Sequence, residues 1–400
     1  MKIALFSGEI ETMSFFSKQL EKAYQKMGDQ VEVFDVYEKD VLEKVKHFIE
    51  PEQTIAISFD FIGLKEDVFR VDQQLIWDVY QIKCVNIMLD HPLGYHQWIE
   101  KRPVNFTMFC IDQNHVTYLN RFYKELQPVY FFPSGGTALT EDCKHLSNET
   151  GPNETGPNEI SLIKNRPMDV CFTGNYIEPE MFHLFLDGRG SEYSVFFRSI
   201  IKELLDNPES TLEDVVERAL IRENGSVTEE ELKETIPNLQ FIDLYVRFFM
   251  RGEVIKKLVD AGIKVHVFGF GWETLVCHKK ENLMIGGELD SKTCLEEIAK
   301  SKISLNVMPW FRAGAHDRIF NSMLNGAVCL TDSSLYLDQV LIHSENALVF
   351  DLKTLEELPV MVKKYLEDDQ KLQRIAECGF RFACEHSWEK NAILFKNRSM

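Results

Sequence analysis

The sequence has no long apolar run and no spaced set of cysteines. None of its apolar stretches approaches the roughly 18 to 20 residues of a membrane-spanning helix, so no transmembrane segment is expected. Its nine cysteines form no Cys-x-x-Cys pair and no spaced cysteine–histidine set, which argues against zinc and dithiol redox motifs. Four lie in apolar runs (Cys84, Cys110, Cys171 and Cys329), so we expect buried free thiols and a cytoplasmic location.

Positive charge is scarce relative to negative charge. The chain has 44 Lys and Arg against 63 Asp and Glu, a formal net charge of −19 at pH 7. A surplus of this size disfavours nucleic acid and anionic membranes as partners. A local basic pocket for a phosphate group is still compatible with it.

Length and periodicity predict two α/β domains. At 400 residues the chain is too long for one ordinary core. Strand-like apolar runs alternate with amphipathic helical stretches, as in the helix that Gly28 closes between strands expected at 2–6 and 31–36. Such alternation is typical of parallel, doubly wound, Rossmann-like sheets.

The domains are expected at residues 1–160 and 161–385. Residues 148–159 read Asn-Glu-Thr-Gly-Pro twice and then Asn-Glu, a polar repeat that predicts a mobile surface loop. A strand and a glycine turn restart the α/β pattern at 168–175. A helical stretch at about 191–260 is longer than a crossover needs, which predicts a helical insertion in the second domain.

The stretch 305–332 predicts a ligand site at one end of a sheet. A strand-like run gives way to a turn at Pro309 and Gly314, and a helix is expected to begin near His316. Polar side chains gather in the loop and the first helical turns: Arg312, His316, Asp317, Arg318 and Asn321. A helix N-terminus with arginines nearby is a natural anion site. An ordinary βαβ unit with a charged helix start is the alternative.

This stretch and two glycine turns also resemble a known family. The residues concerned are Gly314, Arg318, Phe320, Asn321, Gly326, Thr331 and Asp332, with Gly174 and the Gly-Phe-Gly-Trp turn 269–272 before them. They resemble the donor-binding part of GT-B glycosyltransferases, in the group-1-like, family 4-like branch that includes CgeB-type spore-maturation proteins. Asn321 stands where that family usually has Glu, and Asn-Tyr-Ile-Glu at 175–178 stands where it usually has an Arg…Lys pair.

The resemblance implies a GT-B fold, in which two Rossmann-like domains face a cleft. It also implies that the C-terminal helix, here 386–400, crosses back to the first domain. The implied activity is that of a hexosyltransferase-type enzyme, which moves a sugar from a nucleotide-sugar, expected to be a UDP-sugar, to an unknown acceptor. No cofactor is expected. Because the chain has no Asp-x-Asp motif for a nucleotide-bound metal, no metal is expected either.

Roles for individual residues follow from the same resemblance. Arg318 would stabilise the leaving diphosphate. Donor-binding residues would be Gly174, Gly269, Gly271, Trp272, Arg312, His316, Asn321 and Asp332. A tightly packed core residue is the alternative for Trp272.

In the first domain, His91 follows a strand expected to end at Met88. It matches the family in residue type only, at a position that faces acceptor and donor sugar. There an imidazole can act as general base or bind the sugar by a hydrogen bond. A loop histidine that caps a helix is the alternative.

Two other functions fit the same residues. A sugar-nucleotide epimerase shares the fold, and it would need further carboxylates in the cleft. A non-catalytic binding or assembly protein on a degenerate GT-B scaffold would be favoured by Asn321 and by the absent Arg…Lys pair. The acceptor of a transferase is left open between glycan, protein and small molecule.

Overall fold

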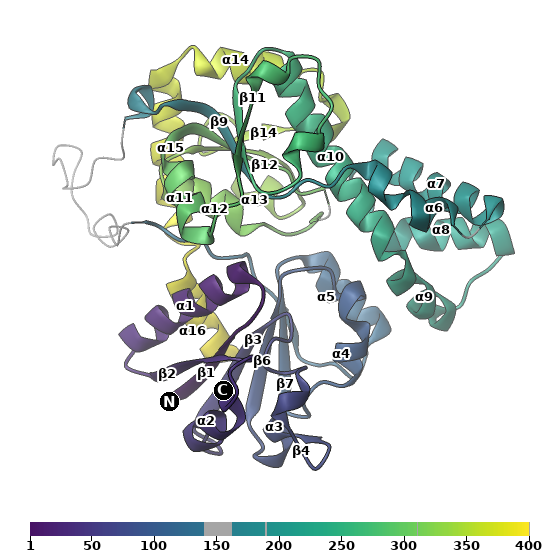
Figure 1. Ribbon diagram of the computed structural model, residues 1–400, viewed down its shortest axis with the longest axis vertical. Coiled ribbons are helices and arrows are strands. Elements are labelled where there is room, and N and C mark those ends of the chain that lie inside the picture. Colours follow the sequence, from purple (N-terminus) through teal and green to yellow (C-terminus); the bar gives the residue numbers. More distant parts are fainter. Residues whose placement is uncertain (140–161, 189, 310, 400) are drawn as a thin grey trace. The chain divides into compact units, whose positions relative to one another are not determined.

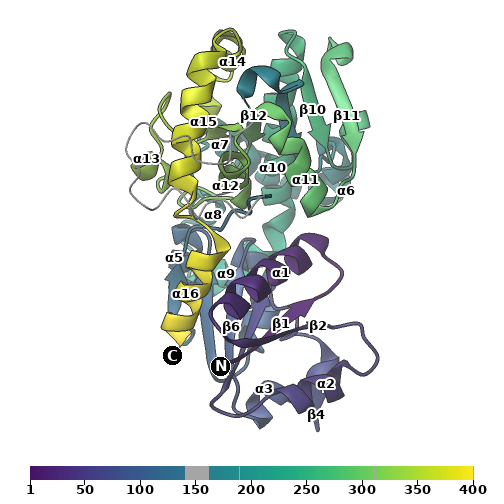
Figure 2. The same cartoon turned by 90° about the vertical axis from the view of Figure 1, so that its left-hand side faces the viewer.

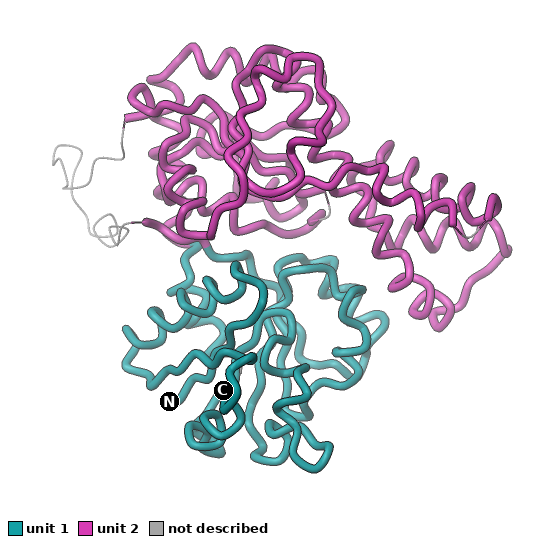
Figure 3. Tube along the Cα trace, in the orientation of Figure 1, with its two compact units in different colours: residues 1–135, 386–400 teal, residues 136–385 magenta. Residues whose placement is uncertain are grey.

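The computed structural model in Figure 1 describes residues 1–139, 162–188, 190–309 and 311–399. The chain divides into two compact units, which Figure 3 distinguishes by colour. Unit 1 contains residues 1–135 and 386–400, and unit 2 contains residues 136–385. The division therefore falls at Gly136, earlier in the chain than the expected boundary at 160. The repeat 148–159 lies outside the described residues.

Unit 1 is built on a six-stranded parallel sheet. Across the sheet the strands are β2 (Gln30–Asp35), β1 (Lys2–Ser7), β3 (Thr54–Phe59), β6 (Lys83–Met88), β7 (Phe106–Cys110) and β8 (Val129–Phe131). Its helices are α1 (Glu11–Lys26), α2 (Val41–Phe48), α3 (Ile76–Val79), α4 (His96–Glu100), α5 (Gln113–Phe122) and α16 (Trp388–Ser399), and a short hairpin joins β4 (Arg70–Val71) to β5 (Gln74–Leu75).

Helix α16 completes the core of unit 1. It lies beside α1 (Figure 2), where the Trp388 ring centroid is 4.7 Å from that of Phe16 and 5.8 Å from that of Phe59. Further along the helix, the Phe395 centroid is 4.8 Å from that of Phe109. Trp388 is 4% exposed and Phe395 is fully buried, so residues from the end of the chain are packed into the sheet that the first 135 residues form.

Unit 2 repeats the same architecture. Across its sheet the strands are β11 (Leu283–Gly287), β10 (Val265–Phe268), β9 (Met168–Thr173), β12 (Ser301–Asn306), β13 (Val328–Asp332) and β14 (Leu348–Phe350), all parallel. Its helices are α6 (His183–Asp187), α7 (Ser191–Asp206), α8 (Leu212–Asn224), α9 (Glu229–Thr235), α10 (Gln240–Asp260), α11 (Ser291–Ala299), α12 (Asp317–Leu324), α13 (Leu337–Val340), α14 (Leu358–Leu366) and α15 (Asp369–Ala383).

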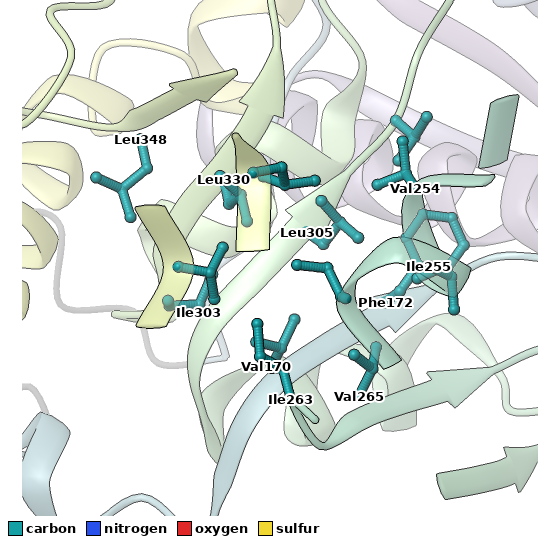
Figure 4. Close-up of a cluster of buried hydrophobic side chains, with 14 of the residues drawn as sticks. Val170, Phe172, Val254, Ile255, Ile263, Val265, Ile303, Leu305, Leu330 and Leu348 are labelled. Carbon is teal, nitrogen blue, oxygen red and sulfur yellow. The ribbon is translucent and has the colours of Figure 1, made fainter. Parts of the chain in front are cut away.

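Branched aliphatic side chains fill the core of unit 2. Figure 4 shows Val170 and Phe172 of β9 beside Ile303 and Leu305 of β12, with Ile255 of α10 over them, and all five are fully buried. Strands covered on both faces carry continuous apolar runs, because neither side of the sheet meets water. Two doubly wound units of this kind confirm the predicted fold class.

The helical insertion lies between β9 and the second half of α10. Helices α6 to α9 and the start of α10 extend away from the sheet of unit 2 (Figure 1). Side-chain caps mark where these helices begin: Thr211 accepts a hydrogen bond from the backbone of Asp214, and Thr228 and Glu231 form a capping box. In the described part of the chain, none of the helices has both the length and the hydrophobicity needed to span a bilayer.

Candidate functional site

The candidate site lies at the carboxyl edge of the sheet of unit 2. In chain order the strands run outward from β9 to β11 on one side and from β12 to β14 on the other, so the strand order reverses between β9 and β12. Open α/β sheets bind ligands outside the carboxyl ends of the strands at such a reversal. Here those ends are Thr173–Gly174 and Asn306.

Helix α12 begins next to this point, with His316 as its N-cap. The ring Nδ1 of His316 accepts a hydrogen bond from the backbone N–H of Arg318 at 3.2 Å, and it also lies 2.7 Å from Oδ1 of Asp317. One nitrogen cannot accept that hydrogen bond and also carry a proton for the carboxylate. Burial lowers the pKa of His316 and the charge of Arg318 lowers it further, against the opposing charge of Asp317. The neutral ring is therefore favoured, and its Nδ1 can either accept from Arg318 or donate to Asp317, but not both.

Arg318 places its guanidinium at the strand reversal. Its Nη1 donates to Oδ1 of Asn306 at 2.7 Å, and its Cζ lies 5.0 Å from the ring centroid of Phe172 at the end of β9. The residue is only 7% exposed, and its Nε has no hydrogen-bond partner among the described residues. Buried polar groups nearly always have partners, so an unused donor here is consistent with a ligand.

Asp332 ends the neighbouring strand in the same region. Its Oδ1 accepts from the backbone N–H of Met308 at 2.8 Å, while its buried Oδ2 has no partner in the described ranges. Burial raises the pKa of Asp332 to about 6, although the Met308 hydrogen bond and the charge of Arg312 oppose the shift. Arg312 is half-buried, and its charge acts on the same carboxyl group.

We expect the cost of the Asp332 charge to appear in the pH dependence of stability. The carboxyl group has an ordinary pKa of 3.8 and a folded-state pKa of about 6, so its ionised form is disfavoured in the folded protein. Ionisation of Asp332 therefore lowers the free energy of unfolding. This loss is absent below about pH 4 and complete above about pH 6, where a difference of two pKa units corresponds to about 3 kcal/mol. Asp332→Asn keeps the acceptor for Met308 but removes the charge. Its gain in unfolding free energy should be near zero at pH 4 and about 3 kcal/mol at pH 8.

Urea denaturation of both proteins between pH 4 and 8 measures this difference. Asp67→Asn is the matched control, because the side chain of Asp67 is 98% exposed and its substitution should leave the pH dependence unchanged. A stability difference for Asp332→Asn that stays constant with pH would show that burial of this carboxylate is not costly.

Two glycines bring the ends of β9 and β10 together. A Cβ on Gly269 would lie 2.5 Å from the carbonyl oxygen of Gly174, and a Cβ on Gly271 would lie 2.0 Å from that of Tyr176. Gly271 also has a φ of +86°, which disfavours other residues. Both glycines therefore permit close packing of the turn 269–272 on residues 174–176. Gly174 itself borders Arg318, whose Nη2 is 3.2 Å from where a Cβ would stand.

Trp272 is a packed residue, the alternative that the sequence left open. It is fully buried, its Nε1–H donates to the carbonyl oxygen of Gly174 at 2.9 Å, and its ring stacks on Tyr176 with centroids 5.1 Å apart. It supports the turn beside Arg318 and does not form an exposed wall of a pocket.

Asn321 has internal partners. Its Oδ1 accepts from the backbone N–H of Thr137 at 2.8 Å, and its Nδ2 donates to Oδ2 of Asp317 at 2.8 Å. One turn later Asn325 accepts from the backbone of Leu139. These amides hold the segment 136–139 against α12, so substitution of Asn321 should first loosen that segment.

Comparisons with known proteins agree with this geometry. Residues 250–396 match a family model described as glycosyl transferase-like. Among solved structures, HepE of Anabaena, in complex with UDP-glucose, has a TM-score of 0.52 and 12% identity, with both chains fully covered. Sucrose-phosphate synthase of Thermosynechococcus elongatus has a TM-score of 0.51 and 11% identity, covering 100% of this chain and 98% of its own. No curated protein gave a significant sequence match.

The chain has the GT-B fold of these structures, as the resemblance implied. The family match itself covers residues 250–396, and glycosyltransferase activity and the CgeB-type branch stay predictions. An α-glucosyltransferase solved with UDP-glucose and DNA containing an abasic site has the same fold, with a TM-score of 0.51, 11% identity and coverage of 100% of this chain and 98% of its own. The fold therefore does not exclude nucleic acid as a partner, and its exclusion rests on net charge alone.

In unit 1, His91 is the N-cap of a short 3-10 helix, Pro92–Tyr95. Its Nδ1 accepts from the backbone N–H of Leu93 at 3.1 Å, so the proton of the neutral ring is assigned to Nε2. The ring lies against His115, with centroids 4.6 Å apart, and against Tyr118. In this tautomer Nε2–H is a hydrogen-bond donor and not a base.

Sequence reasoning missed a buried aspartate in unit 1. Asp60 follows β3 with a left-handed φ of +46° and 1% exposure, and its Oδ1 accepts from the backbone N–H of Leu89 at 2.9 Å. Burial raises the pKa of Asp60 well above its usual value, and the charge of Asp90 raises it further. Asp60 thus supports the turn that carries Asp90 and His91. A left-handed aspartate after a buried strand leaves no signal in the sequence.

Unit 2 also contains a buried cation that sequence reasoning missed. Arg251 of α10 is 6% exposed, and its Cζ lies 5.3 Å from the centroid of the same Phe172 ring that Arg318 contacts. The one available signal was an arginine within an otherwise apolar helix face, between Met250 and Val254. No group of three or more His, Cys, Asp or Glu suited to a metal occurs in the ranges that the structure describes.

Proposed function

We propose that the protein is a glycosyltransferase that takes its sugar from a nucleoside diphosphate sugar, by preference a UDP-sugar, and transfers it to an acceptor without a metal. The observation that carries the proposal is the buried Arg318 guanidinium at the strand reversal of unit 2, whose Nε–H has no partner in the described part of the chain. The structures of HepE and of the α-glucosyltransferase, both bound to UDP-glucose, support the choice of donor.

Arg318 would act on the leaving group. When the bond between the anomeric carbon and the diphosphate breaks, negative charge develops on the diphosphate oxygens. A preorganised cation in a site that excludes water stabilises this charge more than it stabilises the bound donor, and so it lowers the barrier. The hydrogen bond to Asn306 fixes one nitrogen of the guanidinium, which leaves the Nε edge to meet phosphate oxygens.

The proposed function is tested by binding and then by turnover. Thermal shift with UDP, UDP-sugars and other nucleotide sugars, with and without EDTA, identifies the donor and tests independence from metal. Hits are then incubated with the protein, and release of nucleoside diphosphate is compared with conversion of the free donor to its epimer. Epimer formation without transfer or hydrolysis would make the protein an epimerase. Absence of binding to any of these ligands at millimolar concentration would favour a non-catalytic scaffold.

On the acceptor side, we propose that His91 donates a hydrogen bond from Nε2 to a sugar or acceptor hydroxyl. His91→Gln retains an N–H donor, whereas His91→Ala removes it. We therefore expect the alanine variant to lose about tenfold in turnover, the scale of one hydrogen bond, with donor affinity unchanged, and the glutamine variant to retain most activity. Steady-state kinetics with calorimetric donor binding measures both. If both variants lost turnover equally, or if either lost donor affinity, His91 would not be an acceptor-side hydrogen-bond donor.

A cytoplasmic location is part of the same proposal. The cysteines in the described ranges are free thiols, several of them buried in the two cores. Free thiols in these numbers suit a reducing compartment such as the cytoplasm.

A further inference from the structure

Two buried guanidinium groups share one aromatic ring in unit 2. The Cζ atoms of Arg251 and Arg318 lie 5.3 and 5.0 Å from the ring centroid of Phe172, and the two residues are 6% and 7% exposed. They come from different elements, because Arg251 lies within α10 and Arg318 in the first turn of α12. Both therefore converge on the carboxyl end of β9.

The charges in this cluster repel one another. Burial lowers the pKa of Arg251 well below its usual value, and the charges of Arg318 and Arg247 lower it further. Burial likewise lowers the pKa of Arg318, although the negative charges of Asp317 and Asp332 oppose this shift. Two like charges held together away from water destabilise a folded protein, and a bound anion would offset that cost.

A hydrogen bond holds Arg251 in place, but the turn that it contacts does not depend on it. One nitrogen, Nη1, donates to the carbonyl oxygen of Asn175 in the turn after β9. That turn is already held by other contacts, since Phe270 N–H donates to Oδ1 of Asn175 and Trp272 donates to Gly174. An arginine is not required to close it.

We infer that Arg251 is a second anion-binding residue of the donor site, and that Arg251 and Arg318 each hold one phosphoryl group of a diphosphate. The inference rests on the proposed function, because it specifies how the donor is recognised. Two separate guanidinium forks match two linked phosphoryl groups better than one. The site should consequently select nucleoside diphosphates and their sugars over nucleoside monophosphates.

Calorimetry with UDP, UMP and uridine in the presence of EDTA tests this assignment. Wild-type protein should bind UDP at least about tenfold more tightly than UMP. Arg251→Gln should lower UDP affinity by about tenfold to a hundredfold, the range for a hydrogen bond to a charged group, while uridine binding stays the same. Arg251→Lys keeps the positive charge but loses the planar guanidinium, so its UDP affinity should lie between those of the wild type and Arg251→Gln. This variant also provides the test if the glutamine variant does not fold.

Arg222→Gln is the control. Arg222 lies in α8, its side chain is 58% exposed and it forms an ion pair with Glu203 at 2.8 Å, so its loss should change UDP affinity by less than about threefold. If folded Arg251 variants keep the wild-type ratio of UDP to UMP affinity, the inference fails and Arg251 serves only the turn at Asn175.

Inorganic pyrophosphate separates this inference from the proposed function. Thermal stabilisation of the wild-type protein by pyrophosphate, greater than that by phosphate at equal ionic strength and lost in Arg251→Gln, supports the two-arginine site without a nucleotide. If that result came with no binding of UDP or any nucleotide sugar, the proposed donor would be wrong and the anion site would stand. Wild-type protein that is not stabilised by pyrophosphate would overturn the inference.

Discussion

Arg318→Ala should lower the rate of sugar transfer about a hundredfold or more. The guanidinium is buried at the strand reversal of unit 2, and one of its N–H groups has no partner among the described residues. Removal of one preorganised donor from developing negative charge typically costs about 3 kcal/mol, which corresponds to a factor of more than one hundred in rate. Turnover of the donor identified by the binding screen, under saturating conditions, measures the effect.

The fold should survive this substitution. A buried positive charge is removed together with its desolvation cost, and only Asn306 loses a hydrogen-bond partner. Arg318→Lys serves as the comparison, because it keeps a cation near the leaving group without the planar fork and should retain more activity. A folded Arg318→Ala protein with wild-type turnover would show that the guanidinium does not contact the reacting group.

Trp388→Ala should destabilise unit 1 by about 3–5 kcal/mol, the cost of truncating a large buried aromatic side chain. The indole is 4% exposed and lies between Phe16 of α1 and Phe59 of β3, with centroid distances of 4.7 and 5.8 Å. The surrounding rings come from elements that the sheet holds in place, so they cannot collapse into the cavity. Urea denaturation monitored by circular dichroism measures the loss.

A substitution on the exposed face of the same helix provides the control. Ile393 of α16 is 45% exposed, and Ile393→Ala should change the free energy of unfolding by less than about 0.5 kcal/mol. Equal effects at Trp388 and Ile393 would show that packing of the Trp388 indole on α1 and β3 does not stabilise unit 1.

The central strands of the two sheets were predictable from the sequence because they are buried on both faces. The strand expected at 2–6 coincides with β1 to within one residue, and the strand expected to begin at 168 is β9. Continuous apolar runs and helical spacing carry this information locally. The hairpin of β4 and β5 was missed, because its turn uses Asp72 and Gln73 in left-handed conformations (φ +48° and +68°), without the glycine that normally marks such a turn.

The candidate site was only partly predictable. The stretch 305–332 indicated α12 and Arg318, because a strand, a glycine loop and a polar helix start are adjacent in sequence. The direction of the Trp272 side chain could not be read, since the same turn motif suits a packed or an exposed indole. The proximity of Arg251 to Phe172 was not predictable for a different reason: the two residues are separated in the chain by the helical insertion, and no local pattern encodes such a contact.

The path of the chain through its two units has a consequence for biosynthesis. Unit 2 is continuous in the chain, whereas unit 1 is interrupted by it and needs α16 to complete its core. A ribosome therefore releases the whole of unit 2 before the residues that close the hydrophobic core of unit 1. Until α16 is synthesised, nascent unit 1 exposes the apolar surface that Trp388 and Phe395 later cover. Unit 1 is therefore the half of the molecule that most needs a chaperone during translation.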